Sequence, residues 1–256
     1  MKISKNELTS LLKQAFQGCG FSAGVYETAA TTVVWCKTHG FDISSALTAE
    51  KMAGFQAHTK SNVKILVDSQ DELSVDFGGD SFIVSGVLMA ELVYAKSIAA
   101  GLCLGKFIDC PDRKLVSKSV ADFGQRGVHC TAYWRDNEDP NLINVTRTVD
   151  GNWCPEYARY LSAEPSDKRV VELDQSSLYL VCADTSAAMD EYLLSECDEI
   201  IGKPFQYWLS EGIKANERSS LMDGIDITPE LWDLLGGYRD KVLVESTDES
   251  RKGAGA

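Results

Sequence analysis

The sequence predicts an α/β (α+β-like) protein in which a helical N-terminal unit packs on a mixed β-sheet layer that C-terminal helices close. Three patterns carry this prediction. Apolar residues recur at helical spacing through residues 1–60, strand and helix patterns alternate from 61 to 134, and a well-capped helix begins at Thr228. The 256 residues can bury a substantial core, and a hydrophobic content of 44% with 25% charged residues is ordinary for a globular protein.

Three helices are expected at the start of the chain. Ser4 and Glu7 have the capping-box spacing, and the apolar residues that follow lie on one helical face until Gly18. A second helix, rich in alanine and valine, ends near Gly40, and a third spans about residues 45–58. Together these helices form a unit with an apolar surface that another layer must cover.

Strand and helix patterns then alternate. They predict strands at 63–67, 73–77 and 81–84, a helix marked by Leu88, Leu92, Ala95 and Ala99, a strand at 102–108, a helix near 116–123 and a strand at 128–134. Short glycine joints connect the last of these elements, which is typical of an α/β layer. We therefore expect its last strands to be parallel.

The second half continues the sheet and ends in helices. The expected elements are a strand at 143–149, a hairpin turn at Asp150-Gly151, antiparallel strands at 169–173 and 177–182, a helix from Thr185 or Ser186 to about 201, and a helix from Thr228-Pro229. We divide the chain into a helical unit (1–60), a mixed α/β body (61–245) and a mobile tail (246–256), with the first two forming one integrated domain.

Charge is distributed unevenly along the chain. Residues 1–135 carry 14 Lys and Arg against 13 Asp and Glu, whereas residues 136–256 carry 11 against 25. An acidic second half argues against nucleic acid and against an anionic membrane surface as partners. We find no apolar run near the roughly 20 residues that span a bilayer and no signal peptide, and eight scattered cysteines argue against a disulfide framework, so we expect a cytoplasmic protein.

Several motifs are candidates for chemical sites. Gly101–Phe107 has a spacing one residue short of a phosphate-binding loop and lacks its Ser or Thr, so we reject it. A metal site would have to combine Cys36, His39 and His58, with or without Cys110, but no second close pair of ligands completes it, and we predict none. Cys110, next to Arg113 and Lys114, is a candidate nucleophile, although no base or orienting group accompanies it in the sequence.

The order of elements in residues 1–135 resembles the non-Rossmann malate/L-lactate dehydrogenase family, which includes ureidoglycolate dehydrogenases. That family has a Gly-x-x-Ser-His-Gly corner after its second helix and an arginine a few residues beyond the histidine. The parallel stretch here runs from Gly40 to Thr48. The whole chain, with its GAGA tail, also resembles a bacterial domain family of unknown function that is related to these dehydrogenases.

The resemblance implies site positions whose chemistry has changed. Ser44 stands where the family keeps its catalytic histidine, Thr48 where it keeps a substrate-binding arginine, and Asp112 where it keeps a second functional histidine. An alternative alignment, which matches Thr38-His39-Gly40 to Ser-His-Gly, would instead pair His39 with the catalytic histidine. The resemblance also implies a homodimer and an NAD(P) cofactor, but beyond Asp139-Pro140 the family's nicotinamide-binding stretches are not recognisable.

Three hypotheses about function follow. In the first, the chain is a non-dehydrogenase relative that keeps a small-molecule pocket near residues 40–48 and 109–114. The candidate catalytic residues there are His39, Ser44, Cys110 and Asp112, and Thr48, Arg113 and Lys114 would bind substrate. In the second, an oxidoreductase or other enzyme of altered chemistry uses His39. In the third, the acidic second half binds a partner and there is no catalysis. The sequence identifies neither the reaction nor the ligand.

Overall fold

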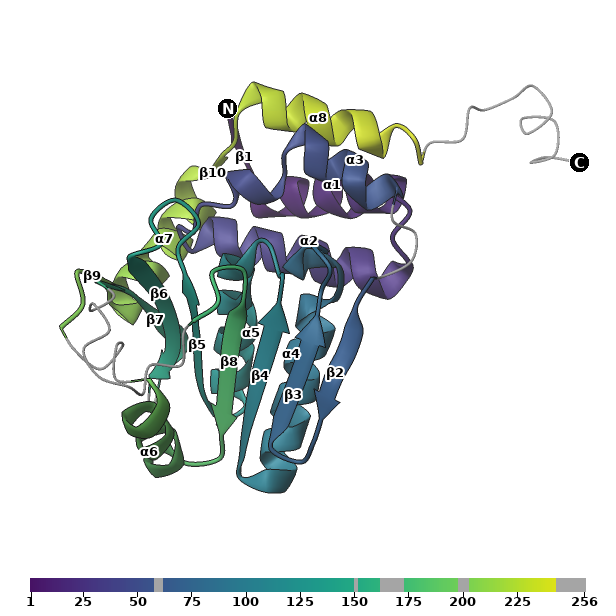
Figure 1. Cartoon of the computed structure of the whole chain (residues 1–256). Helices are drawn as coiled ribbons and strands as arrows, with labels where there is room; N and C mark the ends of the chain where they lie inside the picture. The colour runs from purple at the N-terminus through teal and green to yellow at the C-terminus, as the bar shows by residue number, and fades with distance from the viewer. Residues whose placement is uncertain (58–61, 150–151, 162–172, 198–202, 243–256) are drawn as a thin grey trace, which may run out of the picture.

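The computed structural model describes residues 1–57, 62–149, 152–161, 173–197 and 203–242, and within them the chain forms a mixed α/β structure (Figure 1). Its main sheet has the strand order β2-β3-β4-β8-β5-β6-β7-β9. These strands are β2 (Lys64–Asp68), β3 (Glu72–Asp76), β4 (Leu102–Ile108), β5 (His129–Arg135), β6 (Leu142–Val149), β7 (Asn152–Leu161), β8 (Leu178–Ala183) and β9 (Gln206–Trp208). A separate pair joins β1 (Lys2–Ile3) to β10 (Ile225–Asp226). The predicted fold class is confirmed.

The helices of the described residues are α1 (Lys5–Gly18), α2 (Ala23–Thr38), α3 (Ala49–Ala57), α4 (Phe82–Ala100), α5 (Val116–Gln125), α6 (Ser186–Glu196), α7 (Ser210–Asp223) and α8 (Pro229–Arg239), with 3₁₀ turns η1 (Ser44–Ala46) and η2 (Arg113–Leu115). Among them, α4 and α5 cover one face of the main sheet, α6 packs against β8 and β5 on the opposite face, and other helices lie at one end of the strands. Figure 1 shows α4 and α5 behind the strands, and α1, α2, α3 and α8 above their upper ends.

Local signals placed most helix ends correctly. Ser4 and Glu7 form the predicted capping box of α1, and Thr228 caps α8, whose first residue is Pro229. The predicted helix at 45–58 is instead a 3₁₀ turn followed by α3, because Thr48 starts a new helix by accepting a hydrogen bond from the backbone N–H of Lys51. Helix α7 was not predicted from the sequence.

The strand pairing agrees with one expectation and adds to it. Strands β4 and β5, which we expected to be parallel, run in the same direction, but β8 lies between them and is antiparallel to both. In the register of these three strands Cys182 lies opposite Cys103 on one side and Cys130 on the other. The parallel pair in the sheet is β3 with β4.

Helix α4 differs from its prediction in two ways. The expected strand at 81–84 is the first turn of α4, because the Ser81 hydroxyl accepts from the backbone N–H of Ile83 and caps the helix. The residues that marked the helix in the sequence, Leu88 and Leu92 among them, face outward. Its buried face consists of Phe82, Ile83, Gly86, Met89, Ala90, Val93 and Ser97.

The same helix contains the longest apolar stretch among the described residues. Its 19 residues, with a mean hydropathy of 1.6, make it long and apolar enough to cross a membrane by length and composition alone. The expectation that the chain has no such run is corrected by this segment. Because α4 packs against β4 and β8 along its buried face, we interpret it as a core helix of the sheet layer.

Some predictions concern residues outside the described ranges. The turn at Asp150-Gly151, most of the strand at 169–173, the end of the helix near 201 and the tail at 246–256 all lie there. On either side of that turn, Val149 lies opposite Asn152, so β6 and β7 form the antiparallel pair that the hairpin signal indicated.

Candidate functional site

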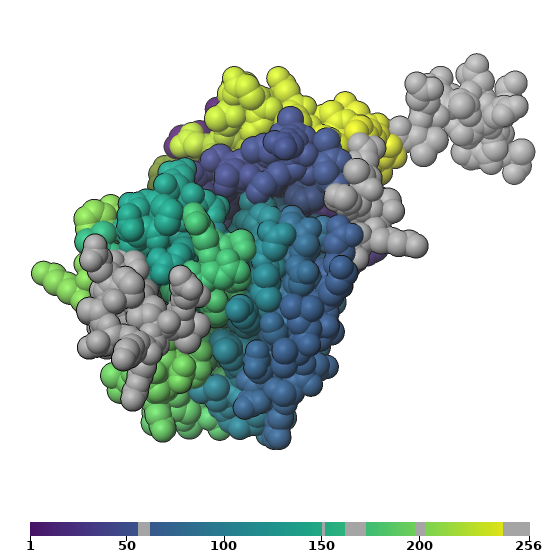
Figure 2. All heavy atoms as spheres, in the orientation of Figure 1, coloured from purple at the N-terminus to yellow at the C-terminus, as the bar shows by residue number. Residues whose placement is uncertain are grey.

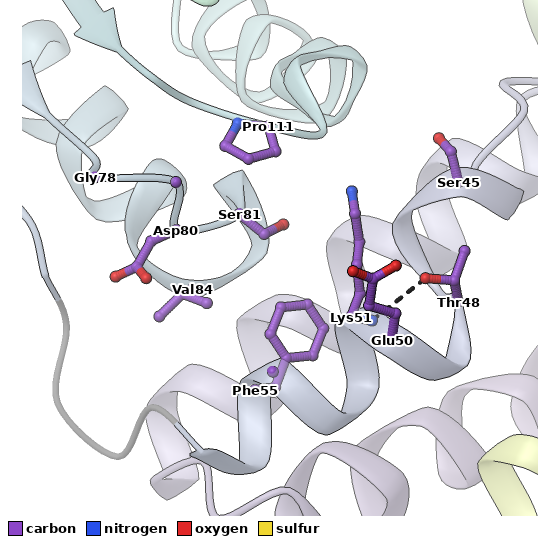
Figure 3. A pocket seen from close by; sticks show the side chains of 12 residues that line it. Ser45, Thr48, Glu50, Lys51, Phe55, Gly78, Asp80, Ser81, Val84 and Pro111 are labelled. Carbon is purple, nitrogen blue, oxygen red and sulfur yellow. Dashed lines mark hydrogen bonds between the residues drawn. The ribbon is translucent and has the colours of Figure 1, made fainter.

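A cavity of about 500 Å³ lies between α3, the turn that joins β3 to α4, and the loop that follows β4 (Figure 3). Cavities of this size hold small organic molecules. The described residues that line it are Ser45, Thr48, Glu50, Lys51, Gly54, Phe55, Gly78, Gly79, Asp80, Ser81, Val84 and Pro111. The fold therefore brings the two segments predicted to form a pocket, residues 40–48 and 109–114, to the same cavity.

A buried carboxylate connects the residues on two sides of this cavity. The carboxylate of Asp112, whose side chain is 2% exposed, forms an ion pair with the ammonium group of Lys51 and accepts a hydrogen bond of 2.6 Å from the Ser81 hydroxyl. Lys51 extends from α3 across the cavity (Figure 3). Three elements that are distant in the sequence are thus joined by one carboxylate.

The backbone around Asp112 is unusual. Asp109 has φ of 48° and Asp112 has φ of 60°, and they are the only described residues other than glycine with positive φ. Aspartate tolerates this left-handed conformation better than most residues, but it still costs free energy. Such strain is concentrated in functional loops, so its position beside the cavity supports this loop as part of a site.

The wall opposite α3 is held rigidly. The backbone N–H of Gly79 donates to the carbonyl of Asp109 at 3.1 Å, and that of Phe82 donates to the carbonyl of Pro111 at 3.0 Å. Asp80 points away from the cavity and accepts from the backbone N–H of Asn62 at 2.8 Å (Figure 3). These bonds fasten the start of α4 to the loop after β4, so the cavity is preformed.

Of the two positions implied by the 40–48 stretch, the structure places one at the cavity. Thr48 lines it, and its hydroxyl accepts from the backbone N–H of Lys51 at 3.3 Å. Ser44 lies outside it, and its hydroxyl donates to the carboxylate of Asp42 at 2.7 Å. The hydrogen bonds from Ser44 lower the pKa of Asp42. The neighbouring Ser45 is the serine that faces the cavity.

Of the cationic candidates, Arg113 forms hydrogen bonds with neighbouring loops and does not face the cavity. It is 4% exposed, and its guanidinium donates to the carbonyls of Gln175 and Ser177 and to the side chain of Asn137. Burial lowers its pKa. Neither Arg113 nor Lys114 is among the described lining residues, so the predicted substrate-binding role of both stays a prediction.

Cys110 lies in the same loop but is sealed from solvent. Its side chain is buried, its thiol lies 3.7 Å from the carbonyl oxygen of Pro111, and burial raises its pKa well above the usual range for a thiol. The thiol is therefore protonated at neutral pH, and a thiolate is the form that attacks as a nucleophile.

His39 lies in a different part of the molecule. Its buried ring stacks on Trp35 at 4.1 Å, and Nδ1 lies 2.8 Å from the carbonyl oxygen of Trp35. Because a carbonyl only accepts, Nδ1 carries the proton, and Nε2 faces the carboxylate of Glu217 at 3.7 Å. Burial lowers the pKa of His39. It does not line the cavity, so the second hypothesis would require a separate site around α2 and α7.

The metal ligands considered in the sequence are not assembled in the described residues. Cys36 is buried, and burial raises its pKa to about 12. Among the residues that the structure describes, no group of three or more His, Cys, Asp or Glu could hold a metal ion, and His58 lies outside them.

Sequence reasoning missed Lys51 and Ser81, which complete the site. Lys51 lies three residues after Thr48, on the cavity side of α3, and would have been found if Thr48 had been recognised as a helix cap. Ser81 follows a Gly-Gly-Asp turn, and its sequence pattern predicts the start of a strand, whereas in the structure it caps helix α4.

Comparisons with known proteins agree with this architecture. Residues 3–66 match the model of the family described as "Protein of unknown function (DUF3726)". No curated protein sequence matches. The structure is similar to sulfolactate dehydrogenase from Methanocaldococcus jannaschii (TM-score 0.65, 10% identity, 94% of this chain and 97% of that chain). It is also similar to malate dehydrogenase from Pyrococcus horikoshii OT3 (0.63, 10%, 96% and 96%) and to a putative malate/lactate dehydrogenase from E. coli (0.63, 11%, 99% and 98%). At these identities the likeness shows a shared fold, and the resemblances noted in the sequence are confirmed at that level.

Proposed function

We propose that the protein binds a small, uncharged or positively charged molecule in the cavity between α3 and the loop after β4, and that it does not transfer hydride. The observation that carries this proposal is the pairing of Lys51 with Asp112. The one cationic side chain among the described lining residues is already neutralised by a buried carboxylate.

A 2-oxo or 2-hydroxy acid is a poor match for these walls. Its carboxylate needs a free cation or several N–H donors. The ammonium group of Lys51 has further N–H donors, but its charge is already balanced by Asp112, and drawing it away would leave that carboxylate buried without a cation. Thr48 offers a hydroxyl but no charge, and no histidine is among the described lining residues to act as a proton donor.

A nicotinamide cofactor, implied only by resemblance, also fits poorly here. A pyrophosphate is usually held by free N–H groups at a helix start. At the start of α4, the N–H of Phe82 donates to Pro111, and the N–H groups of Ile83 and Val84 donate to the side chain and the carbonyl of Ser81. These donors are occupied, so we derive no hydride step through this site.

The walls suit a molecule with an apolar part and a hydrogen-bonding or cationic end. Phe55, Val84 and Pro111 provide apolar surface, the hydroxyl groups of Ser45 and Thr48 lie on the α3 side, and Glu50 adds a carboxylate. Small amino alcohols have this combination of groups. We take them as the representative ligand class.

A thermal-shift experiment tests the proposal. Amino alcohols should raise the midpoint of unfolding, by about 2.7 kcal/mol of stabilisation at a hundred times the dissociation constant. Pyruvate, malate, NADH and NADPH should not raise it. Oxidation of NADH or NADPH with any 2-oxo acid would refute the absence of hydride transfer.

A filled-cavity variant locates the binding. Gly54 lines the cavity, and a side chain added there meets no atom within 4 Å. Gly54→Leu should therefore fold and abolish the shift. Gly212→Leu, also in a helix with open space and outside the cavity, is the matched control and should retain the shift. A shift that Gly54→Leu leaves intact would show that binding occurs elsewhere.

The hypothesis of chemistry at His39 is tested separately. If any turnover is found, His39→Gln and Cys110→Ser should be compared with Lys51→Met. Loss of activity only in His39→Gln would favour the second hypothesis, whereas loss only in Lys51→Met would place catalysis at the cavity.

A further inference from the structure

Strand β2 ends the main sheet and is exposed along its whole length. It is the first strand in the sheet order, and within the described residues it is paired only on its β3 side. Its three central residues are nevertheless apolar, with exposed fractions of 52% for Ile65, 56% for Leu66 and 39% for Val67. Figure 2 shows this part of the chain at the right margin of the molecule. An edge strand presents unpaired backbone N–H and C=O groups, and an apolar one is a template for another strand.

The pairing with β3 leaves the middle of β2 unmatched. The register shifts between Ile65 and Val67, so that Leu66 has no partner residue in β3. The side chain of Leu66 is thus the most exposed of the three, although leucine is strongly apolar. The strand therefore offers an apolar centre with a charged residue at each end, Lys64 and Asp68.

The sequence of β2 is complementary to itself when reversed. In an antiparallel pair of two copies centred on Leu66, Lys64 of one copy lies opposite Asp68 of the other, and Ile65 lies opposite Val67. A parallel pair in register would instead place Lys64 against Lys64 and Asp68 against Asp68. Because the antiparallel pair brings opposite charges together at both ends, the charges select that arrangement.

We propose that β2 is an interaction surface for a second copy of this chain, which it binds by antiparallel pairing with the same strand about a two-fold axis at Leu66. This pairing is isologous, so each copy contributes the same residues and the contact closes at two subunits. It joins the two sheets into one and satisfies the backbone groups of both edges. Asp68 already pairs with Lys96 of α4, but its side chain is 59% exposed and its second oxygen can accept from Lys64 of the other copy.

The apolar stripe on α4 is a competing surface. Leu88 is 63% and Leu92 is 38% exposed, and Ala95 and Ala99 continue the stripe at helical spacing. Glu91 and Lys96 of α4 would also face each other in an antiparallel pair of helices, but both already form ion pairs within the chain, with Arg126 and Asp68, and a helix has no unpaired backbone edge to satisfy. Association through this helix is therefore an outcome that the experiment must separate from pairing through β2.

Sedimentation velocity of the full chain, from low to high micromolar concentration, tests the proposal. The wild type should reach a dimer at the upper concentrations. Leu66→Lys should remain monomeric, because it places two ammonium groups on the two-fold axis. Lys64→Glu, which sets a carboxylate against the Asp68 carboxylate of the other copy, should weaken the dimer by about tenfold or more.

A charge swap tests the register. The double variant Lys64→Glu/Asp68→Lys restores opposite charges across the antiparallel pair and should recover the dimer. Because the swap also removes the intrachain pair with Lys96, Lys96→Met serves as the control and should dimerise like the wild type. Circular dichroism confirms that each variant is folded. All of these positions are at the surface, and Lys64→Glu alone suffices if Leu66→Lys does not fold.

Three results would overturn the proposal. The first is a wild type that is monomeric at every concentration. The second is a dimer that Leu66→Lys and Lys64→Glu leave unchanged. The third is a dimer that Leu88→Lys dissociates while Lys64→Glu does not, which would place the contact on α4. Failure of the double variant to recover the dimer would refute the antiparallel register.

Discussion

Removing the ammonium group of Lys51 tests how much its ion pair with Asp112 contributes to the stability of the fold. Lys51→Met keeps most of the aliphatic stem but leaves the Asp112 carboxylate, which is 2% exposed, with the Ser81 hydroxyl as its remaining side-chain donor. Loss of one partner from a fully buried ion pair costs about 3–5 kcal/mol. Because the Lys51 side chain is 31% exposed, water screens the pair, and we expect a loss of about 2 kcal/mol.

A double-mutant cycle measures the interaction itself. Asp112→Asn keeps the shape of the side chain and an oxygen that can accept from Ser81, so it should cost less than Lys51→Met. The double variant Lys51→Met/Asp112→Asn should be more stable than the sum of the two single losses predicts, by about 1–2 kcal/mol. The assay is urea unfolding followed by circular dichroism, and the loss in Lys51→Met corresponds to a fall of about 4–8 °C in the midpoint of thermal unfolding.

A matched control uses an exposed pair. Lys13 forms an ion pair of 3.3 Å with Glu27, and both side chains are largely in solvent, at 37% and 58% exposure. Lys13→Met should therefore change stability by no more than about 0.5 kcal/mol. If Lys51→Met were as mild, or if the losses in the cycle simply added, the carboxylate would not be held by Lys51 and the argument for the ligand class would fail.

The same variant makes a second, opposite prediction for binding. With the ammonium group gone, the Asp112 carboxylate is free to pair with a cation in the cavity. Amino alcohols should then stabilise Lys51→Met more than they stabilise the wild type, although the variant is less stable without ligand. Equal or smaller stabilisation in the variant would indicate that the cationic group does not approach Asp112.

Three further predictions concern the rest of the fold. A Cβ atom added at Gly18 would lie 1.9 Å from the backbone oxygen of Tyr238, so Gly18→Ala should force α1 and α8 apart. We expect it to lower the free energy of unfolding, measured with a chemical denaturant, by about 1–3 kcal/mol. Gly24→Ala, whose added atom meets nothing within 4 Å, is the control and should not destabilise the protein. Burial lowers the pKa of His39 from 6.5, so as the pH falls below that value the unfolded chain takes up a proton that the native protein resists. Native stability should fall with it, and this component of the pH dependence should be absent in His39→Gln. All eight cysteines are buried, and burial raises the pKa of Cys19 to about 11, so the native thiols should react slowly with Ellman's reagent and quickly after unfolding; a fast native thiol would contradict the packing.

Features that depend on neighbouring residues were predictable from the sequence. The capping box of Ser4 and Glu7, the Thr228 cap and the alternating residues of β2 and β3 each involve groups within a few positions of one another. Their hydrogen bonds and side-chain spacing are fixed locally, whatever the rest of the chain does. The general place of the cavity also came from the sequence, through the resemblance of two segments to a known family.

Spacing alone could not tell which face of an element is buried. Leu88 and Leu92 have helical spacing, and α4 is indeed a helix, but the buried face carries Met89 and Val93 instead. An apolar helix offers two possible faces, and only the packing of the sheet against it selects one. Leu66 has the same ambiguity, since an apolar residue in a strand reads as core until the sheet order shows the strand at an edge.

The sequence by itself determined most of the elements and the acidic second half, and the resemblance implies that Ser44, Thr48 and Asp112 stand where the related family has two histidines and an arginine. Tertiary structure decided which side chains meet at the cavity. Lys51 and Asp112 are 61 positions apart, and nothing local relates them until α3 and the loop after β4 meet at the start of α4. A buried charge requires a partner, but which partner it finds depends on the path of the whole chain, because that path determines which distant side chains share the same low-dielectric space.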